Sequence, residues 1–103
     1  MVEHYDYLNI DTSHIAVAGD SAGGNLAAGV SLYARDHKGP KIEKVMLIYP
    51  VLDHTMSTVS MRDYYDTPMW NSNLNKDMWK LYLKNGDYGL LDYASHIKNC
   101  SWL

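Results

Sequence analysis

The chain has 103 residues, of which 47% are hydrophobic and 20% are charged, a composition typical of one globular domain or part of one. Nine Lys and Arg against twelve Asp and Glu give a net charge of −3, which argues against a nucleic-acid surface or a polybasic membrane patch. The single cysteine, Cys100, excludes an internal disulfide framework and favours a cytoplasmic location. No apolar run approaches the roughly 20 residues of a membrane span.

The first half of the chain predicts a strand followed by a helix. Ile15 and Val17 alternate with alanines, which indicates a short buried strand over residues 14–18. Apolar residues then recur at helical spacing and Gly39-Pro40 closes the segment, so a helix is expected over residues 22–36.

The second half begins with another strand. The nearly continuous apolar run over residues 44–49 ends at Pro50 and is typical of a parallel strand covered on both faces. Strand, helix and strand together predict one parallel βαβ unit. A second helix is expected over residues 73–84, with Ser72 or Asn73 as its N-cap and Gly86 past its end. Residues 87–103 predict a loop with one helical turn.

The pentapeptide Gly19-Asp20-Ser21-Ala22-Gly23 lies between the first strand and the first helix. This GxSxG pattern is typical of a serine nucleophile held on a tight strand-to-helix turn, where small flanking residues leave room for the backbone. A glycine-rich turn without chemistry is one alternative. A phosphate cradle is another, but neither GxGxxG nor GxxxxGK[ST] occurs here and no Lys or Arg lies before Tyr33.

The run Gly-Asp-Ser-Ala-Gly-Gly-Asn-Leu-Ala-Ala from Gly19, with Ile15-Ala16-Val17-Ala18 before it and Leu47-Ile48-Tyr49-Pro50-Val51-Leu52-Asp53 after it, resembles the hormone-sensitive-lipase-like esterases of the α/β-hydrolase fold. The likeness covers residues 9–53 and continues more weakly through 69–83, which is similar to the family's cap segment. It implies a single incomplete α/β-hydrolase domain over residues 1–103, with a core βαβ at about 9–53 and a cap-like region at about 54–90.

The resemblance also implies roles for the residues of the turn. Ser21 would be the nucleophile that attacks a small ester substrate, and the backbone N–H of Ala22 would donate to the oxyanion. Gly19, Asp20, Gly23 and Gly24 would support the turn. No cofactor and no metal are expected.

Other parts of the family's machinery do not occur in this sequence. An HGGG-type oxyanion segment is absent, and the family's triad acid and histidine follow the serine on later loops. We therefore expect a central fragment of a larger esterase, inactive or very weak alone. The rest of a polypeptide or a second copy of the chain would complete its sheet. The alternative is a non-catalytic remnant that acts as an oligomerising or partner-binding module.

Two groups of side chains are weaker candidates. His54, beside Asp53 after the second strand, is the most plausible local base, because His14 and His37 are expected at the far ends of the first strand and helix. Asp92 and His96 would share a helix face, a spacing more typical of an exposed pair. The methionines and tryptophans over residues 56–79 either pack in the core or line an acyl pocket.

Overall fold

The structure, a computed structural model, describes residues 2–84 and 91–95. The described residues form two units, one containing residues 2–52 and 92–95 and the other 53–84 and 91. The elements in chain order are the 3-10 helix η1 (Val2–His4), α1 (Tyr5–Leu8), β1 (Ile15–Asp20), α2 (Ala22–Asp36), β2 (Ile42–Ile48), α3 (Val59–Asp63), α4 (Ser72–Tyr82) and α5 (Leu91–Ala94).

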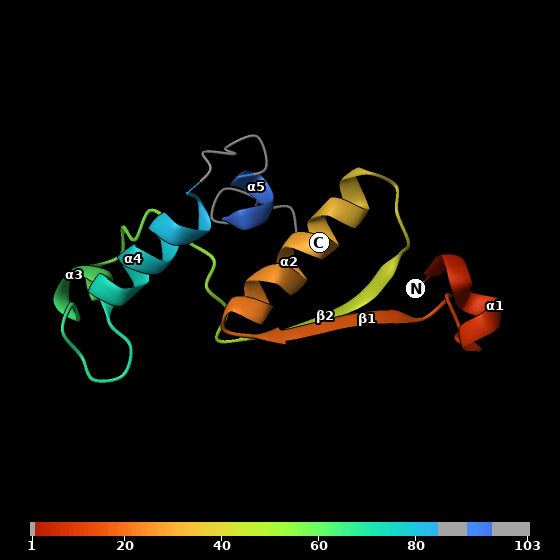
Figure 1. The fold of residues 1–103 in the computed structure, drawn as a ribbon, viewed down its shortest axis with the longest axis horizontal. Helices are drawn as coiled ribbons and strands as arrows, with labels where there is room; N and C mark the ends of the chain where they lie inside the picture. The colour runs from red at the N-terminus through yellow and green to blue at the C-terminus, as the bar shows by residue number, and fades with distance from the viewer. Residues whose placement is uncertain (1, 85–90, 96–103) are drawn as a thin grey trace. The chain divides into compact units, whose positions relative to one another are not determined.

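The first unit is built on β1, α2 and β2 (Figure 1). The two strands pair in parallel, with Val17 opposite Val45 and Asp20 opposite Ile48. α2 connects them and packs against both strands. Parallel pairing requires such a crossover, because the chain must return to the start of the sheet before the second strand. The turn between β1 and α2 therefore lies at the carboxyl edge of the sheet.

The predicted helix over residues 22–36 has the bounds of α2, whereas both strands differ from their predicted bounds. β1 begins one residue later than predicted and continues through Gly19 and Asp20. These two residues have poor strand propensity, but the sheet register places them opposite Leu47 and Ile48. β2 begins two residues earlier than predicted and ends before Tyr49, whose φ of 34° is incompatible with an extended strand.

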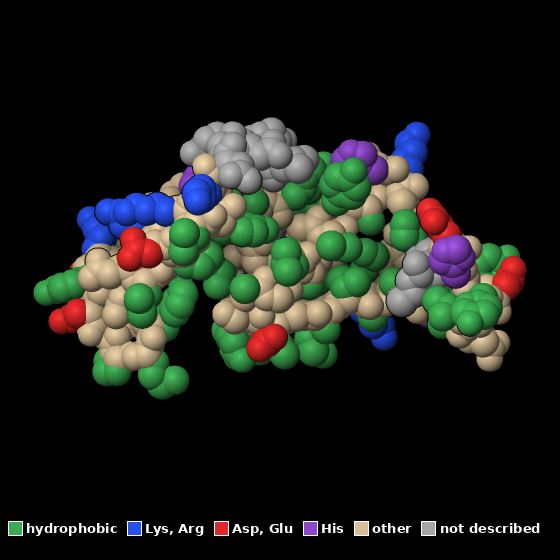
Figure 2. All heavy atoms as spheres, in the orientation of Figure 1, with side chains coloured by type: hydrophobic (Ala, Val, Ile, Leu, Met, Phe, Trp, Pro, Cys, Tyr) green, Lys and Arg blue, Asp and Glu red, His purple; other side chains and the backbone are tan. Residues whose placement is uncertain are grey.

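The expectation of strands covered on both faces is wrong for the described part of the chain. Residues of β1 alternate between half-buried and exposed, and Met46 of β2 is 62% exposed. The reason is that α2 covers a single face. Figure 2 shows hydrophobic side chains on the surface over α2 and the strands, and the exposed ones include Leu26, Val30, Val45, Met46 and Ile48.

Among the described residues of the first unit, the buried apolar side chains are Ala27, Ala28 and Leu32, and all three belong to α2. Gly24, at the start of that helix, is buried too, and a Cβ added there would lie 2.9 Å from Cβ of Pro50. A side chain at this position would therefore force the first turn of α2 away from the segment that follows β2.

The second unit contains α3, which the sequence did not predict, and α4. Asn71 rather than Ser72 or Asn73 is the N-cap of α4, and its Oδ1 accepts from the N–H of Leu74 at 3.0 Å. Ser72 does not cap because its buried hydroxyl donates to the carbonyl of Tyr64 at 3.3 Å. Gly86, the predicted residue past the helix, lies outside the described residues.

Candidate active site

Ser21 lies alone between the last residue of β1 and the first residue of α2. Its φ of 48° and ψ of −116° are close to the first central position of a type II′ turn, about +60° and −120°, which glycine normally occupies. Holding a residue with a Cβ in such a region costs about 1–3 kcal/mol. The backbone at Ser21 is therefore strained, and the strain falls on the residue that the sequence identified as the nucleophile.

Backbone hydrogen bonds hold this conformation from both sides. The N–H of Ser21 donates to the carbonyl of Ile48 at 2.9 Å. The carbonyl of Ser21 accepts from the N–H of Asn25 at 3.2 Å and from the N–H of Val51 at 3.3 Å. Each such bond contributes about 0.5–1.5 kcal/mol net, so the three together are comparable with the strain that they oppose.

The hydroxyl of Ser21 is exposed and is not used to cap the helix. Ser21 occupies the N-cap position of α2, yet its side chain makes no capping hydrogen bond, unlike Asn71 at α4. The first N–H groups of the helix, at Ala22, Gly23 and Gly24, have no intrahelical acceptor by position. A hydroxyl and N–H donors at the positive end of a helix are thus presented by one turn.

The glycines around Ser21 differ in how much space a side chain would have at each position. A Cβ at Gly19 would overlap the carbonyl of Gly23. A Cβ at Gly23, in contrast, would meet Oδ1 of Asp20 at 3.7 Å, which is ordinary contact. Gly19 is therefore required by close approach of the backbone, as is Gly24, whereas Gly23 has space for a methyl group.

Asp20 precedes the serine and is exposed at the end of β1. Its Oδ2 lies 3.5 Å from the hydroxyl of Tyr49, which donates to it from the residue after β2. This contact links the ends of the two strands on either side of the turn.

The histidines of the first unit lie away from Ser21. His14 precedes β1, at the opposite end of that strand from the serine, and its Nδ1 is 3.0 Å from Oε2 of Glu43. His37 follows the last residue of α2, and its ring stacks on Tyr33 at a centroid distance of 3.8 Å. Both rings therefore have a partner of their own, and both lie at the end of their element that is distant from Ser21, as the sequence predicts.

His54 belongs to the second unit, where its half-buried ring meets Trp79 edge-on with centroids 6.1 Å apart. Trp79 is 4% exposed, and its indole N–H has no hydrogen-bond partner among the residues described. His54, Met56 and Trp79 line a hollow of about 460 Å³ together with Leu83 and three lysines of the same unit. Met69, in contrast, is 98% exposed. The role of His54 as a base stays a prediction, and His96 lies outside the described residues.

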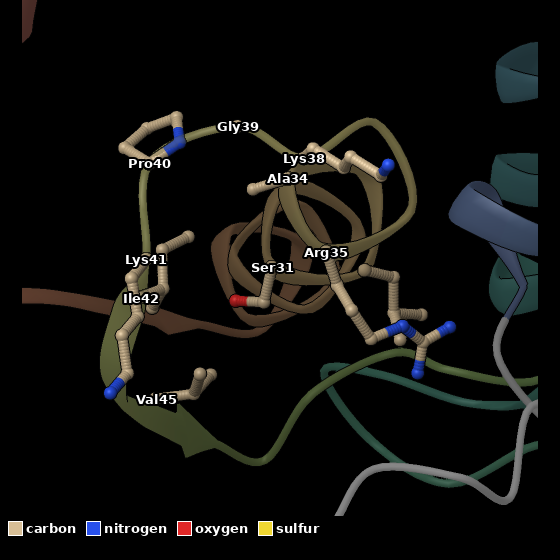
Figure 3. Close-up of a pocket in the computed structure, with 10 residues that line it drawn as sticks. Ser31, Ala34, Arg35, Lys38, Gly39, Pro40, Lys41, Ile42 and Val45 are labelled. Atoms are coloured by element: carbon tan, nitrogen blue, oxygen red, sulfur yellow. The ribbon is translucent and has the colours of Figure 1, made fainter.

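A second hollow, of about 300 Å³, lies between the C-terminal half of α2 and the start of β2 (Figure 3). It is at the opposite end of α2 from Ser21. Lys38 and Lys41 line it, but Figure 3 shows their amino groups pointing away from one another. These two lysines therefore do not converge on a common point in the hollow.

Two residues that contact the turn, Asn25 of α2 and Val51 after β2, were given no role by the sequence. Asn25 is 4% exposed and donates from Nδ2 to the carbonyl of Val51 at 2.6 Å. Val51 in turn donates to Ser21. A signal existed for Asn25, because asparagine is a poor helix former and its presence in the first turn of an alanine-rich helix indicates a tertiary contact.

Residues 2–84 and 91–95 contain neither a cluster of metal ligands nor a helix that could span a membrane. This part of the chain holds no group of three His, Cys, Asp or Glu side chains that could bind a metal ion. None of its helices has the length and apolar character needed to cross a bilayer.

Comparisons with known proteins place these observations in a family. A family model described as alpha/beta hydrolase fold matches residues 1–100. The esterase LipI of Mycobacterium tuberculosis is 41% identical over 69 residues, which cover 67% of this chain and 22% of the relative. Neutral cholesterol ester hydrolase 1 of Rattus norvegicus is 34% identical over 94 residues, covering 87% of this chain and 22% of the relative.

A solved structure extends the likeness to the fold. The structure titled bacterial heroin esterase superimposes with a TM-score of 0.83 and 39% identity, covering 93% of this chain and 32% of that one. The chain thus spans about a fifth of the length of both curated relatives named above.

Proposed function

Because the chain belongs to the alpha/beta hydrolase fold family, we propose that it carries the nucleophile turn of a carboxylic-ester hydrolase, with Ser21 as the nucleophile. The fold class and the esterase relationship predicted from the sequence are confirmed by the family match and by the esterases among its relatives. One observation carries the proposal of Ser21. Its backbone is held in a strained conformation between β1 and α2, with the hydroxyl exposed and not used as a cap.

The proposed reaction is acyl transfer through a serine ester. Oγ of Ser21 attacks the carbonyl carbon of the substrate, and its proton passes through a base to the alcohol oxygen, whose bond to the carbonyl carbon breaks. Water then attacks the acyl-serine, which releases the carboxylic acid and restores the hydroxyl. The N–H of Ala22, the first residue of α2, donates to the oxygen that becomes negative in each step.

The supporting residues act on the turn rather than on the substrate. Gly19 and Gly24 support it by allowing the close approach of backbone described above. Asp20 supports it through Tyr49. Gly23 follows as part of the first helical turn, where its N–H adds to the positive end of α2.

We propose that the acid, the base and the remaining oxyanion donors come from the rest of a longer hydrolase domain. The sequence holds no HGGG-type segment, and the chain spans 22% of the curated relatives described above. Losing the triad histidine costs on the order of a millionfold in rate, so the chain alone would turn over esters very slowly. A small ester is the proposed substrate, because the relatives are named as esterases and an ester hydrolase.

The identity of a local base and the location of the protein in the cell are also proposals. His54 is the local candidate for the base, but its ring packs on Trp79 within the second unit, which favours a packing role. The cytoplasmic location rests on the single cysteine of the sequence. The alternative of a non-catalytic oligomerising module is not favoured, because the proteins that the chain matches are esterases.

A fluorophosphonate probe tests the proposal in a chimera in which this chain replaces the matching third of the solved bacterial heroin esterase, because the probe labels a serine that a base activates. The chimera should be labelled and its Ser21→Ala variant should not. Ser31→Ala is the matched control, because Ser31 is a serine of α2 whose hydroxyl donates to the carbonyl of Ala27 at 2.7 Å. Labelling that survives in Ser21→Ala, or that disappears in Ser31→Ala, would contradict the assignment.

Ester turnover by the same chimera is a second test of the assignment, because the whole domain is present. We expect hydrolysis of a short-chain nitrophenyl ester that Ser21→Ala lowers on the order of a millionfold. A folded chimera that hydrolyses the ester equally well with Ala at position 21 would overturn the proposed nucleophile.

A further inference from the structure

The side-chain amide of Asn25 is buried in the first turn of α2 and is used twice as a donor. Nδ2 donates to the carbonyl of Val51 and to the carbonyl of Ala94, both at 2.6 Å. An amide nitrogen has two hydrogens, so these two bonds account for its whole donor capacity. Asparagine has a low helix propensity and does not stabilise α2 at this position. Its presence is therefore explained by its tertiary hydrogen bonds.

One of those bonds closes a ring around the nucleophile. Val51 receives the Asn25 side chain on its carbonyl and gives its own N–H to the carbonyl of Ser21. The backbone N–H of Asn25 donates to that same Ser21 carbonyl. Three residues are thus joined by three hydrogen bonds, and two of those bonds end on the strained residue.

We propose that Asn25 is a positioning residue that holds Ser21 in its reactive conformation by fixing the peptide groups of Val51. This inference rests on the proposed function of Ser21. Without the side-chain amide, Val51 keeps a single tie to the turn, and the segment after β2 is free to move away from it. The Ser21 carbonyl then loses one of its two donors, and the strained backbone can relax.

The second bond, to Ala94, suggests the competing explanation that Asn25 only fastens α5 to α2. α5 has other attachments in the same unit. The hydroxyl of Tyr93 donates to Oδ2 of Asp36 at 3.0 Å, and Ser95 donates to the carbonyl of Leu52 at 3.3 Å. Tyr93→Phe therefore loosens α5 without touching the ring around Ser21, which makes it the matched control for Asn25→Ala.

The first measurement reads the backbone of the full chain by NMR and needs no reactivity. Asn25→Ala should make amide hydrogen exchange at Val51 at least about tenfold faster and should move the carbonyl 13C resonance of Ser21. The amide of Leu32, buried further along α2, should keep its protection and so report that the helix is intact. Tyr93→Phe should change neither Val51 nor Ser21. Asn25→Ser, a smaller change that keeps one donor, replaces Asn25→Ala if that variant does not fold.

The second measurement is the rate of fluorophosphonate labelling at Ser21 in the chimera with the bacterial heroin esterase, which supplies the base. Asn25→Ala should lower it about ten- to a hundredfold, the size of effect that a misplaced reacting group produces, while Tyr93→Phe stays within about twofold. A folded chimera that is not labelled would refute the proposed function, and the NMR readouts would still decide the role of Asn25. Unchanged Val51 exchange and Ser21 carbonyl shift in Asn25→Ala would overturn positioning, and so would a Tyr93→Phe variant that reproduces the losses of Asn25→Ala.

Discussion

The backbone N–H of Ser21 donates to the carbonyl of Ile48 at 2.9 Å, which ties the turn after β1 to the last residue of β2. Ser21 lies one residue past β1 and so extends the pairing of the two strands into the turn. Its positive φ is therefore imposed by the neighbouring strand and by the ring of hydrogen bonds on its carbonyl, against the preference of a serine backbone.

Strain at Ser21 predicts an unusual pair of stability changes. Ser21→Gly should make the chain more stable than Ser21→Ala by about 1 kcal/mol, because glycine alone adopts this conformation without a Cβ clash. Both variants lack the hydroxyl, so their difference reports the strain less the greater unfolded-state entropy of glycine. Urea unfolding followed by circular dichroism measures it. Equal stabilities would show that Ser21 is relaxed in solution.

The two glycines of the GxSxG pattern should respond differently to substitution. Gly19→Ala should destabilise the chain by more than about 2 kcal/mol, since its methyl group would overlap the carbonyl of Gly23. Gly23→Ala should stabilise it by about 0.5 kcal/mol, because the methyl group meets only ordinary contact and alanine is the better helix former. Thermal unfolding of the two variants side by side is the measurement. A Gly23→Ala variant as unstable as Gly19→Ala would contradict the geometry of the turn.

The cap of α4 can be tested within the second unit. Asn71→Ala should cost about 1 kcal/mol, because the N–H of Leu74 loses its acceptor. Asn71→Ser should recover most of this loss, since a serine hydroxyl also caps. If Ser72 were the true cap, Asn71→Ala would be neutral in urea unfolding and Ser72→Ala would remove the cap instead.

Asp36 and Tyr93 should make stability depend on pH at both extremes. Hydrogen bonds from Arg35 and then from Tyr93 lower the pKa of Asp36 below its ordinary 3.8, so its contribution is complete above 3.8 and is lost as pH falls below it. Desolvation and then the hydrogen bond to Asp36 raise the pKa of Tyr93 above its ordinary 10.0. The contribution of Tyr93 is complete below pH 10.0 and is lost as pH rises further.

The variant Asp36→Asn tests this pair directly. The pKa of Tyr93, followed by its ring resonances, should fall toward its ordinary value when the carboxylate is removed. Asp20→Asn, at the opposite end of α2, should leave that pKa unchanged. An unchanged Tyr93 titration in Asp36→Asn would show that the two side chains are not bonded in solution.

Much of the first unit follows from residue patterns. The bounds of α2 could be predicted because Leu26, Val30 and Tyr33 recur at helical spacing and Gly39-Pro40 stops the helix. The extension of β1 through Asp20 could not, because it depends on the register with β2. The N-cap of α4 is Asn71, one or two residues before the predicted Ser72 or Asn73, for a similar reason, since the buried hydroxyl of Ser72 donates to the carbonyl of Tyr64 eight residues earlier.

The sequence by itself determined the family, the βαβ order and the serine to examine, because these depend on local spacing and on a short motif. The tertiary structure alone decided how that serine is held. Ile48 and Val51 reach Ser21 across 27 and 30 residues of chain, and the contact of Asn25 with Val51 spans 26. Such contacts form only when α2 packs along the strands and the end of β2 lies beside the turn. The residue pattern within a single element does not predict contacts between residues so far apart in the sequence.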